Sequence, residues 1–522
     1  MRRVALILCL LAAGAAPAAA ADAPPLVPRD PASLEQETHA LLRVADASAH
    51  ATLRRAGGVE VSRSLGIWRV PSAEAARLLP RLALDGAVLD AEPDRARQRL
   101  DHLSRGDTLL HHQWWLARVG ADRAEPPGPG VPVTVVDGGV DLAHPEFASR
   151  PNTVALNEQT LRGRNDYHGT AVASIVGAPA DGAGIVGVYP HALLQLWDAS
   201  PTGSQLTTAD VIRGIEAASL RGRGIVNLSL GGVFRSRLEE LAIVHAYERG
   251  SVVVAASGNE REQGNRPGFP ASLPHVVTVG AVDAADRLAP FSSSSPGMDL
   301  VAPGVAIPVA VPAAQSPAGY LQADGTSFAT PIVSGAAAWI WTVRPELDKT
   351  QLVELLRQSA RPLDAAGRSP DTGFGLLDIP AALSRPAPSV DPLEPNDDLN
   401  QVVPGRMFAA GKAPLTRPGA GRAVVDARLD AVDDPRDVYR VWVPGGGRVV
   451  VALTGAAPVA LRYAGPTPIR SASRLASRRL ELVNRGRAGA FVYVTAAIEP
   501  GAQPSFGAYR LALTTGRAPA RR

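Results

Sequence analysis

The chain has 522 residues, which is long for one domain and suggests about three. Of these residues 46% are hydrophobic and 20% are charged, a composition typical of a globular protein. The 53 basic and 50 acidic residues nearly balance, and the resulting formal charge of +3 excludes a nucleic-acid binder on charge grounds.

The first 21 residues have the parts of a secretory signal. Arg2 and Arg3 precede an apolar stretch from Val4 to Ala13, and small residues suited to signal peptidase follow it. This stretch is too short to cross a bilayer, and we expect no membrane span elsewhere. Residues 1–21 are therefore expected to be removed on export, which makes the mature protein secreted and extracellular. Cys9, the one cysteine of the chain, lies inside this signal.

Residues Thr38–Asp94 predict a small α+β unit. Runs of strand length alternate with two helical patterns in the order strand, helix, strand, strand, helix, strand. The arginine-rich stretch Asp94–Asp107 follows, and we expect it to be an exposed segment open to proteolysis. A solvated helix face is the alternative interpretation of that stretch.

The middle of the chain alternates short apolar runs with helical segments, which predicts an α/β domain with a parallel sheet. Strands are expected at Val131–Val136, Leu193–Leu196, Ile225–Leu230, Ser251–Ala256 and Val276–Val279. Helices are expected at Ala171–Ile175, Ala209–Leu220 and Arg237–Arg249. In such folds ligands bind beyond the carboxyl ends of the strands.

Three residues at the ends of expected elements are candidates for a nucleophilic site. Asp137 follows a valine-rich strand, His168 opens a helical run, and Ser327 begins a long helix of small residues. Each residue alone fits an ordinary role in a turn or a helix cap. In this chain order, however, they match one of the three known orders of an Asp-His-Ser triad. A serine hydroxyl needs such a base to attack a peptide carbonyl at neutral pH.

Two further segments suit that chemistry. Asn259 follows the apolar run Ser251–Ala256 and is a candidate donor to the negative oxygen of a tetrahedral intermediate, together with the backbone N–H of Ser327. From the residues alone, a turn-forming asparagine is the alternative. The other segment consists of Ser229, Leu230, Gly231 and Gly232 and ends an apolar run. Because its two glycines have no side chains to block another backbone, an extended peptide can pair with it as an added strand.

The sequence motifs around these residues resemble, in the same order, the motifs of the subtilisin-like serine proteases. They are DGGVDLAHPEF, HGTAVASIVG, VNLSLGG, AASGNE and GTSFATPIVSGAAA. The resemblance extends from Gln113 to Leu383 and implies a complete catalytic domain that needs no cofactor. It assigns catalytic roles to the triad and to Asn259. One departure is Gly138, which stands where the family usually has serine or threonine.

The same resemblance implies a pocket for the side chain that precedes the cleaved bond. One wall is the Ser229–Gly232 segment, and the other consists of Ala256, Ser257 and Gly258. The floor is Gly268. A glycine floor leaves room for a bulky apolar side chain. Glu260 at the rim would also tolerate lysine or arginine, unless it is only a solvated loop charge. The Phe269-Pro270 bond matches a position where the family places a cis proline.

The resemblance also assigns the regions on either side of the active-site blocks. Residues 22–105 are expected to be a propeptide that acts as an intramolecular inhibitor, and residues 106–385 the peptidase domain. Glu146 and Asp181 fall where secreted members of the family have side-chain ligands of a structural calcium ion. Two carboxylates beside a glycine-rich loop are also common without an ion, so the sequence leaves calcium open.

The last part of the chain predicts a separate β domain. Residues 386–391 lie in a stretch rich in proline and acid and are expected to be a linker. Residues 392–522 alternate β-rich runs with Gly-Pro turns, which predicts a small antiparallel sandwich with a disordered tail. This region resembles the C-terminal domain of many secreted bacterial proteases. A role in substrate or surface binding, or in stability alone, stays open.

The expected function is a secreted serine endopeptidase, made as a self-processing zymogen, that acts on protein or peptide substrates. The alternative is a catalytically silent, subtilase-like binding protein whose C-terminal domain does the work. The presence of all four catalytic-type residues argues against that alternative. An α/β-hydrolase esterase is excluded, because it needs a Gly-x-Ser-x-Gly turn and the chain order Ser, acid, His.

Overall fold

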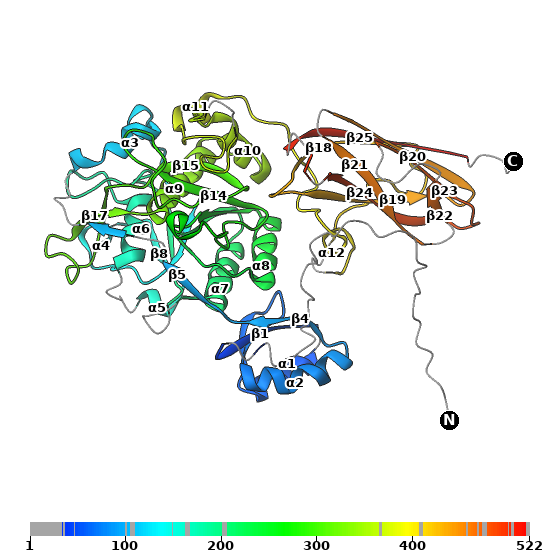
Figure 1. Cartoon of the computed structure of the whole chain (residues 1–522), viewed down its shortest axis with the longest axis horizontal. Helices are drawn as coiled ribbons and strands as arrows, with labels where there is room; N and C mark the ends of the chain where they lie inside the picture. Colours follow the sequence, from blue (N-terminus) through cyan, green and yellow to red (C-terminus); the bar gives the residue numbers. More distant parts are fainter. Residues whose placement is uncertain are drawn as a thin grey trace.

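The computed structural model describes residues 34, 37–45, 47–99, 102–104, 110–148, 150–161, 167–200, 206–364, 368–406, 411–455, 458–466, 469–471, 478–499, 501–502 and 506–517. They form an N-terminal body (37–94), a central body (110–385) and a C-terminal body (391–517), coloured blue, cyan to yellow, and orange in Figure 1. The expected signal and C-terminal tail lie outside the described residues. Within the described ranges, no helix combines the length and the apolar character that a membrane crossing requires.

The N-terminal body is a four-stranded antiparallel sheet, in the order β2-β3-β1-β4, with two helices packed on one face. Its elements follow the predicted order: β1 (His39–Val44), α1 (Ala47–Arg55), β2 (Val59–Ser62), β3 (Ile67–Pro71), α2 (Ser72–Leu84) and β4 (Val88–Pro93). Successive side chains of β1 point to opposite faces of the sheet. Leu42 packs against the two helices, whereas Leu41 packs against the central body. Both faces of this small sheet are therefore covered.

The central body is built on a seven-stranded parallel sheet in the order β15-β14-β13-β11-β7-β9-β8. Its strands are β7 (Val133–Asp137), β8 (Thr153–Ala155), β9 (Leu194–Asp198), β11 (Gly224–Leu228), β13 (Ser251–Ala256), β14 (Val276–Val282) and β15 (Met298–Pro303). Its helices are α3 (Trp114–Val119), α4 (Pro145–Ala148), α5 (Glu158–Leu161), α6 (Tyr167–Gly177), α7 (Thr208–Ser219), α8 (Arg237–Glu248), α9 (Thr326–Val343), α10 (Lys349–Ser359) and α11 (Ile379–Ser384). The predicted α/β architecture is confirmed.

The parallel sheet is buried on both faces, which explains its uninterrupted apolar strands. In β13, Val252 and Val254 join the core under α6 and α9, while Val253 and Ala255 join the core under α7 and α8. The predicted bounds of β13 are correct. The run expected at Ile225–Leu230 is instead two strands, because β11 ends at Leu228 and the chain turns at Ser229 toward α9.

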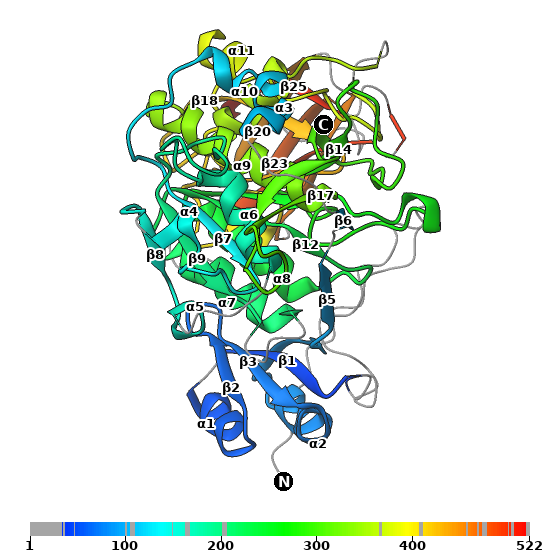
Figure 2. The same ribbon diagram turned by 90° about the vertical axis from the view of Figure 1, so that its left-hand side faces the viewer.

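Two short strands lead from the N-terminal body along the central body (Figure 2). β5 (Ala96–Arg99) pairs antiparallel between β10 (Leu206–Thr207) and β12 (Leu230–Gly231). β6 (His102–Ser104) pairs with β17 (Tyr320–Asp324), which also pairs with β16 (Ile307–Ala310). The stretch Asp94–Asp107 was expected to be exposed, but its two described strands are paired backbone. The physical reason is that extended backbone satisfies the open N–H and C=O groups of neighbouring edges.

The C-terminal body is an antiparallel sandwich, as predicted. Its sheets have the orders β18-β25-β20-β23-β22 and β19-β24-β21. The elements are α12 (Leu399–Val402), β18 (Arg422–Asp430), β19 (Arg436–Val443), β20 (Gly447–Gly455), β21 (Val459–Ala464), β22 (Ile469–Ser471), β23 (Arg479–Asn484), β24 (Ala490–Ile498) and β25 (Phe506–Arg517). Alternate residues of β20, Val449, Val451 and Leu453, fill the space between the sheets.

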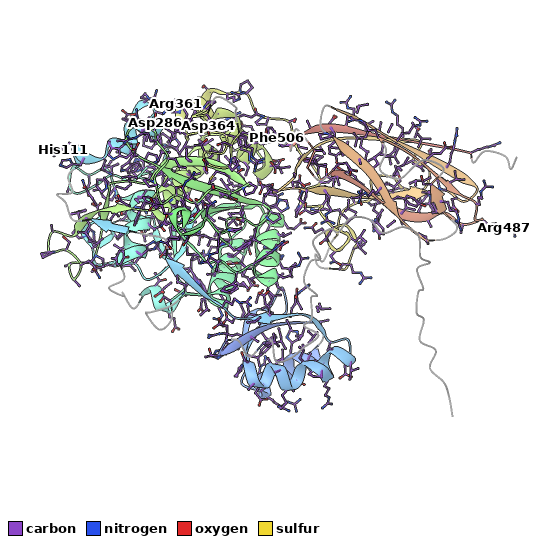
Figure 3. All side chains as sticks on the ribbon, viewed as in Figure 1. His111, Asp286, Arg361, Asp364, Arg487 and Phe506 are labelled. Atoms are coloured by element: carbon purple, nitrogen blue, oxygen red, sulfur yellow. The ribbon has the colours of Figure 1, made fainter. Side chains whose placement is uncertain are left out.

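The junction between the central and C-terminal bodies is packed. Residues 386–387 and 389–390 are exposed, as a linker should be, but Asp391 at the end of the expected linker is only 5% exposed. Phe506 of β25 lies at the boundary between the two bodies (Figure 3), with its ring centroid 5.4 Å from that of Phe374. Pro388 is also buried, and the carboxylate of Asp391 accepts a hydrogen bond from the Arg428 N–H, so the segment contacts the bodies that it joins.

Candidate active site

Asp137 and His168 meet at the carboxyl end of the parallel sheet. Asp137 is the last residue of β7 and His168 the second residue of α6, and both are fully buried. The Nδ1–H of His168 donates to Asp137 Oδ1 over 2.7 Å, and the Gly138 N–H donates to the same oxygen over 2.6 Å. This pairing leaves Nε2 of the neutral ring as its basic nitrogen.

Gly169 allows α6 to begin this close to β7. A Cβ atom at Gly169 would lie 2.4 Å from the Gly138 carbonyl oxygen and 2.8 Å from that of Gly139. These contacts are with backbone, which cannot rotate away as a side chain can. Only glycine therefore fits directly after His168, since any other residue would push the helix start away from Asp137.

Ser327 is the second residue of α9 and is also fully buried. Its Oγ donates to the Ser229 carbonyl over 3.2 Å, and Ser229 Oγ donates to the Ser327 carbonyl over 2.8 Å. The ring of the next residue, Phe328, has its centroid 5.9 Å from that of His168. The start of α9 thus lies beside the start of α6 and beside the chain that leaves β11.

Asn259 follows β13 and lies against the start of α9. Its Oδ1 accepts hydrogen bonds from both the N–H and the hydroxyl of Thr326, each over 3.0 Å. Its Nδ2 is buried and has no hydrogen-bond partner among the described residues. The side chain is therefore held by its oxygen, and its amide N–H groups are left for an acceptor next to Ser327.

The backbone of the segment Ser229–Gly232 is paired on both sides in this structure. Leu230 and Gly231 form β12, whose partner is β5 from the N-terminal part of the same chain. Gly232 exchanges two backbone hydrogen bonds with Phe269, over 2.9 and 2.8 Å. The edge therefore sits between an extended segment on one side and the Gly268-Phe269 turn on the other.

The expected pocket residues lie together. A Cβ atom at Gly268 would be 2.7 Å from the Ser257 carbonyl oxygen, so the floor approaches the wall that continues from Ala256. Gly258 has φ +113°, a left-handed conformation that favours glycine, and its N–H donates to Thr326 Oγ1 over 3.3 Å.

The structure also describes two further features beside this pocket. The Phe269-Pro270 peptide is cis, as predicted. Glu260 at the rim is half-buried and accepts a 3.4 Å hydrogen bond from Ser293 Oγ. It is therefore not simply a solvated loop charge.

The expected calcium ligands do not form an ion cage. Glu146 is buried, and its Oε1 accepts hydrogen bonds from the Ile185 N–H (2.9 Å) and the Tyr320 hydroxyl (2.8 Å). Asp181 is exposed and accepts from the N–H of Ala183. Burial raises the pKa of Glu146, and the charge of Asp181 adds to that shift. Because protein donors already occupy the buried oxygen, these residues do not fit a calcium ion.

Sequence reasoning missed three contributors to the site. Gly169 is one, although a glycine directly after a candidate base is a readable signal of close approach. Thr326 is another, because its two donors orient Asn259. The third is the edge Leu206–Thr207, which pairs with β5 on the side opposite β12. Its sequence signal is the pair of residues directly before a capped helix.

Comparisons with known proteins identify the family of the chain. The profile of the Subtilase family matches residues 128–376. A subtilisin of Bacillus pumilus is 35% identical over 265 residues, which are 49% of this chain and 91% of that protein. Subtilisin E of Bacillus subtilis (strain 168) is also 35% identical over 265 residues and is covered over 66% of its length.

A solved structure extends the likeness in fold. The crystal structure of fervidolysin from Fervidobacterium pennivorans, described as a keratinolytic enzyme related to subtilisin, aligns with a TM-score of 0.58 and 23% identity. The alignment covers 80% of this chain and 66% of that one. At this identity the likeness concerns the fold alone.

We predict that Gly169→Ala destabilises the protein by about 1–3 kcal/mol, the cost of overpacking a tightly packed site. The added methyl group meets the Gly138 and Gly139 carbonyls, so α6 must shift. Denaturant unfolding of both proteins in a Ser327→Ala background measures the difference. Gly128→Ala is the matched control, because a Cβ there meets nothing within 4 Å. Equal stability of the two variants would contradict the close-approach explanation.

Proposed function

The chain belongs to the subtilase family and is a serine endopeptidase of the subtilisin type, and we propose that it is a secreted, self-processing zymogen with Asp137, His168 and Ser327 as its catalytic triad. The observation that carries this proposal is the buried 2.7 Å hydrogen bond between Asp137 and His168, next to the start of α9, where Ser327 is the second residue. Labelling of the processed protein by a fluorophosphonate, and its loss in Ser327→Ala, is the direct test.

The proposed reaction begins with attack of Ser327 Oγ on the substrate carbonyl carbon. His168 Nε2 takes the hydroxyl proton as the bond forms and later gives it to the leaving amine. Asp137 keeps the ring in the required tautomer and stabilises the imidazolium. The acyl-enzyme on Ser327 is then hydrolysed by a water that His168 activates in the same way. No cofactor takes part in these steps.

Asn259 is proposed to stabilise the tetrahedral intermediate. Its Nδ2 and the backbone N–H of Ser327 would donate to the oxyanion, and the N-terminus of α9 adds its positive dipole. The support is that Thr326 holds the other end of the amide while Nδ2 has no partner among the described residues. Preorganised donors of this kind need not reorient when the charge forms.

The substrate is proposed to bind as an extended strand between Leu206–Thr207 and Ser229–Gly232. Its side chain before the cleaved bond would enter the pocket walled by Ala256–Gly258, with Gly268 at the floor. The absence of a side chain at Gly268 favours bulky apolar residues, and Glu260 adds tolerance of lysine and arginine. The support is that β5 of the chain itself has this backbone pairing.

The zymogen proposal follows from the same pairing. We take residues 1–21 as signal, 22–105 as propeptide, 106–385 as peptidase domain, 386–391 as linker and 392–522 as C-terminal domain. While β5 lies between β10 and β12, no other peptide can pair with those edges. The propeptide would thus inhibit the enzyme until it is cut and released.

A catalytically silent binding protein is the alternative from the sequence, and the match to the Subtilase family supports the endopeptidase instead. Such a binding protein would use the C-terminal sandwich and leave Ser327 without a role. An unprocessed wild-type chain that does not react with fluorophosphonate would favour it. The retained Asp137–His168 pair and the anchored Asn259 favour the enzyme.

Removal of the oxyanion donor tests the transition-state role. We expect Asn259→Ala to lower kcat by about 10²- to 10³-fold with little change in KM, the size known for one such donor in a subtilisin. Steady-state hydrolysis of a peptide substrate measures both constants. A raised KM with an unchanged kcat would remove Asn259 from this role.

Self-processing is expected between the ends of β5 and β6. β5 ends at Arg99 opposite Leu230, and β6 begins at His102 opposite Asp324, so the cut falls between them. The bulky apolar residue there is Leu100, which predicts Asp101 as the new N-terminus, so residues 101–105 of the expected propeptide range would stay on the mature enzyme. N-terminal sequencing of the purified wild type measures this.

Variants of the nucleophile Ser327 and of Leu100, the residue before the expected cut, test whether the chain processes itself. Ser327→Ala should stay uncut, because loss of the nucleophile removes nearly all of a triad effect of about 10⁶-fold. Leu100→Phe should still be processed, whereas Leu100→Asp should be processed far more slowly. Equal processing of Ser327→Ala, expressed alone, would mean that another protease makes the cut.

Propeptide inhibition should weaken as pH rises. Glu92 of β4 accepts a hydrogen bond from the Arg237 N–H at the start of α8, and burial raises its pKa to about 7. Burial likewise raises the pKa of Asp90 to about 7. The docked state therefore holds protons that the free propeptide releases at lower pH. Docking is strongest at acid pH and is progressively lost as pH rises toward about 7.

The inhibition constant of added propeptide (residues 22–100) against the mature enzyme, measured from pH 5 to 8, tests this dependence. Each group contributes at most a tenfold loss of affinity per pH unit. Glu92→Gln should flatten the profile, and Glu74→Gln on the exposed face of α2 should leave it unchanged. An inhibition constant that does not vary with pH in the wild type would contradict the prediction.

A further inference from the structure

Phe234 is an exposed aromatic residue beside the backbone edge that pairs with β5. It lies two residues after Gly232, in the loop that leads from β12 to α8. Phe234 is 53% exposed, although the N-terminal body is docked next to this loop through the hydrogen bond from the Arg237 N–H to Glu92. An exposed phenylalanine at the end of such an edge is a candidate contact for the chain that pairs with the edge.

The side chain that meets the Phe234 ring belongs to Arg95. The guanidinium carbon of Arg95 lies 4.6 Å from the ring centroid, within the distance of about 6 Å at which an aromatic face attracts a cation. Arg95 directly precedes β5, which pairs with the proposed substrate edges. The segment of the chain that occupies these edges therefore places a cation on this ring.

The backbone of Arg95 is also held by the central body. Its carbonyl oxygen accepts hydrogen bonds from the N–H of Thr208 over 3.2 Å and from the Thr208 hydroxyl over 3.1 Å. β10 continues this pairing along residues 96–97. The extended pairing on this side thus reaches one residue beyond β5. Because side chains alternate along an extended chain, the backbone position of Arg95 decides the direction of its side chain.

The charges around Phe234 leave its ring as the feature of the loop that attracts a cation. Glu240 of α8 pairs with Arg235 over 2.7 Å and with Arg237 over 2.8 Å, so these two arginines already neutralise its charge. A guanidinium is planar and more weakly hydrated than the ammonium of lysine, so it stacks better on an aromatic face. The ring therefore favours arginine over lysine, and lysine over an uncharged or acidic side chain.

The register of β5 relates this contact to a substrate position. With the proposed cut after Leu100, Arg95 is the sixth residue before the cleaved bond. A substrate that pairs with the same edges in the same register has its own sixth residue at Phe234, because extended chains have the same rise per residue. Its carbonyl oxygen at this position would accept from Thr208, as that of Arg95 does.

We propose that Phe234 forms a subsite for an arginine side chain six residues before the cleaved bond, so that the enzyme prefers protein substrates with arginine at this position. This inference rests on the proposed function, since it requires that substrates bind along Leu206–Thr207 and Ser229–Gly232. The subsite is distinct from the pocket above Gly268, which receives the residue directly before the cut. A cation–π contact at an exposed site contributes about two- to fivefold in affinity.

Peptide hydrolysis by the processed wild-type enzyme tests the preference. The parent peptide has the sequence of residues 93–104, and three further peptides carry Arg95→Lys, Arg95→Leu or Arg95→Glu. We expect kcat/KM to fall about two- to fivefold for Arg95→Leu, mainly through a higher KM, with Arg95→Lys in between and Arg95→Glu lower still. Mass spectrometry of the products verifies that every peptide is cut at the same bond.

Variants of the enzyme assign the preference to the ring. Phe234→Leu keeps an apolar side chain and removes the aromatic face, so it should cut the parent and the Arg95→Leu peptide with equal kcat/KM. Phe234→Trp keeps an aromatic face and should retain the preference. Leu220→Ala is the matched control, because it truncates another exposed apolar side chain, 59% exposed at the end of α7, and should keep the full preference.

The possible outcomes separate this inference from the proposed function. Equal kcat/KM for the parent and the Arg95→Leu peptide in the wild type would overturn the subsite and leave the endopeptidase intact. A preference that is unchanged in Phe234→Leu would also overturn it, since a general effect of peptide charge does not need the ring. A wild type that cuts none of the peptides and does not react with fluorophosphonate would contradict the proposed function itself, and the subsite with it.

Cleavage-site profiling provides a test that needs no variant. The processed wild-type enzyme digests a mixture of denatured proteins, and mass spectrometry identifies the residues before each cut. Arginine should be enriched about two- to fivefold at the sixth residue before the cut, relative to its frequency in the mixture. No enrichment at this position, or enrichment at the fifth or seventh residue instead, would overturn the proposal even if Phe234→Leu failed to fold.

Discussion

The hydrogen bond between Asp137 and His168 sets the main constraint on the central body. A 2.7 Å contact between the end of a strand and the start of a helix requires backbone to approach backbone, which is why glycine follows His168. It also requires β7 to lie inside the sheet, where β9 and β11 keep its last residue from moving. α9 brings Ser327, and the chain that leaves β13 brings Asn259, to the same edge of the sheet. Rigid packing on both faces of the sheet gives these side chains one arrangement.

Much of this arrangement could be predicted from sequence, and the failures have physical causes. β13 was predictable to the residue because a strand buried on both faces is apolar throughout. β15 was missed because it contains Asp299, a buried acid whose charge is neutralised by Arg357, 58 residues further along the chain. No local pattern reveals such a partner. The break at Ser229 was also hidden, since the hydroxyl and carbonyl of that residue bond to a helix that begins almost a hundred residues later.

The triad candidates and Asn259 were found because their chain order and the motifs around them can be read directly from the sequence. The pairing of β5 was not found, because its composition of arginine and glutamine resembles a solvated segment, and a backbone that pairs with distant edges leaves no signature in its side chains.

The two interfaces of the central body treat buried acid differently. On the N-terminal side, Glu92 and Asp94 accept hydrogen bonds from the N–H groups that open α8 and α7, so helix ends stabilise the carboxylates. On the C-terminal side, the carboxylates of the buried Asp391 and Glu394 and of the half-buried Asp434 lie close to one another instead. Burial raises the pKa of Glu92, so part of the strength of the N-terminal contact falls as pH rises, while the apolar contacts of Leu41 stay.

The position of β5 between β10 and β12 also constrains how the sequence can change over evolution. In the proposed zymogen, the backbone edges that would bind substrates are occupied by β5 of the same polypeptide, so one set of edges would serve both maturation and digestion. A substitution that narrows the proposed pocket would then alter both the proteins that can be cut and the propeptide end that can be accepted. Under this proposal, selection acts on the two edges and on residues 96–101 together, and substrate preference can change only as far as self-processing permits.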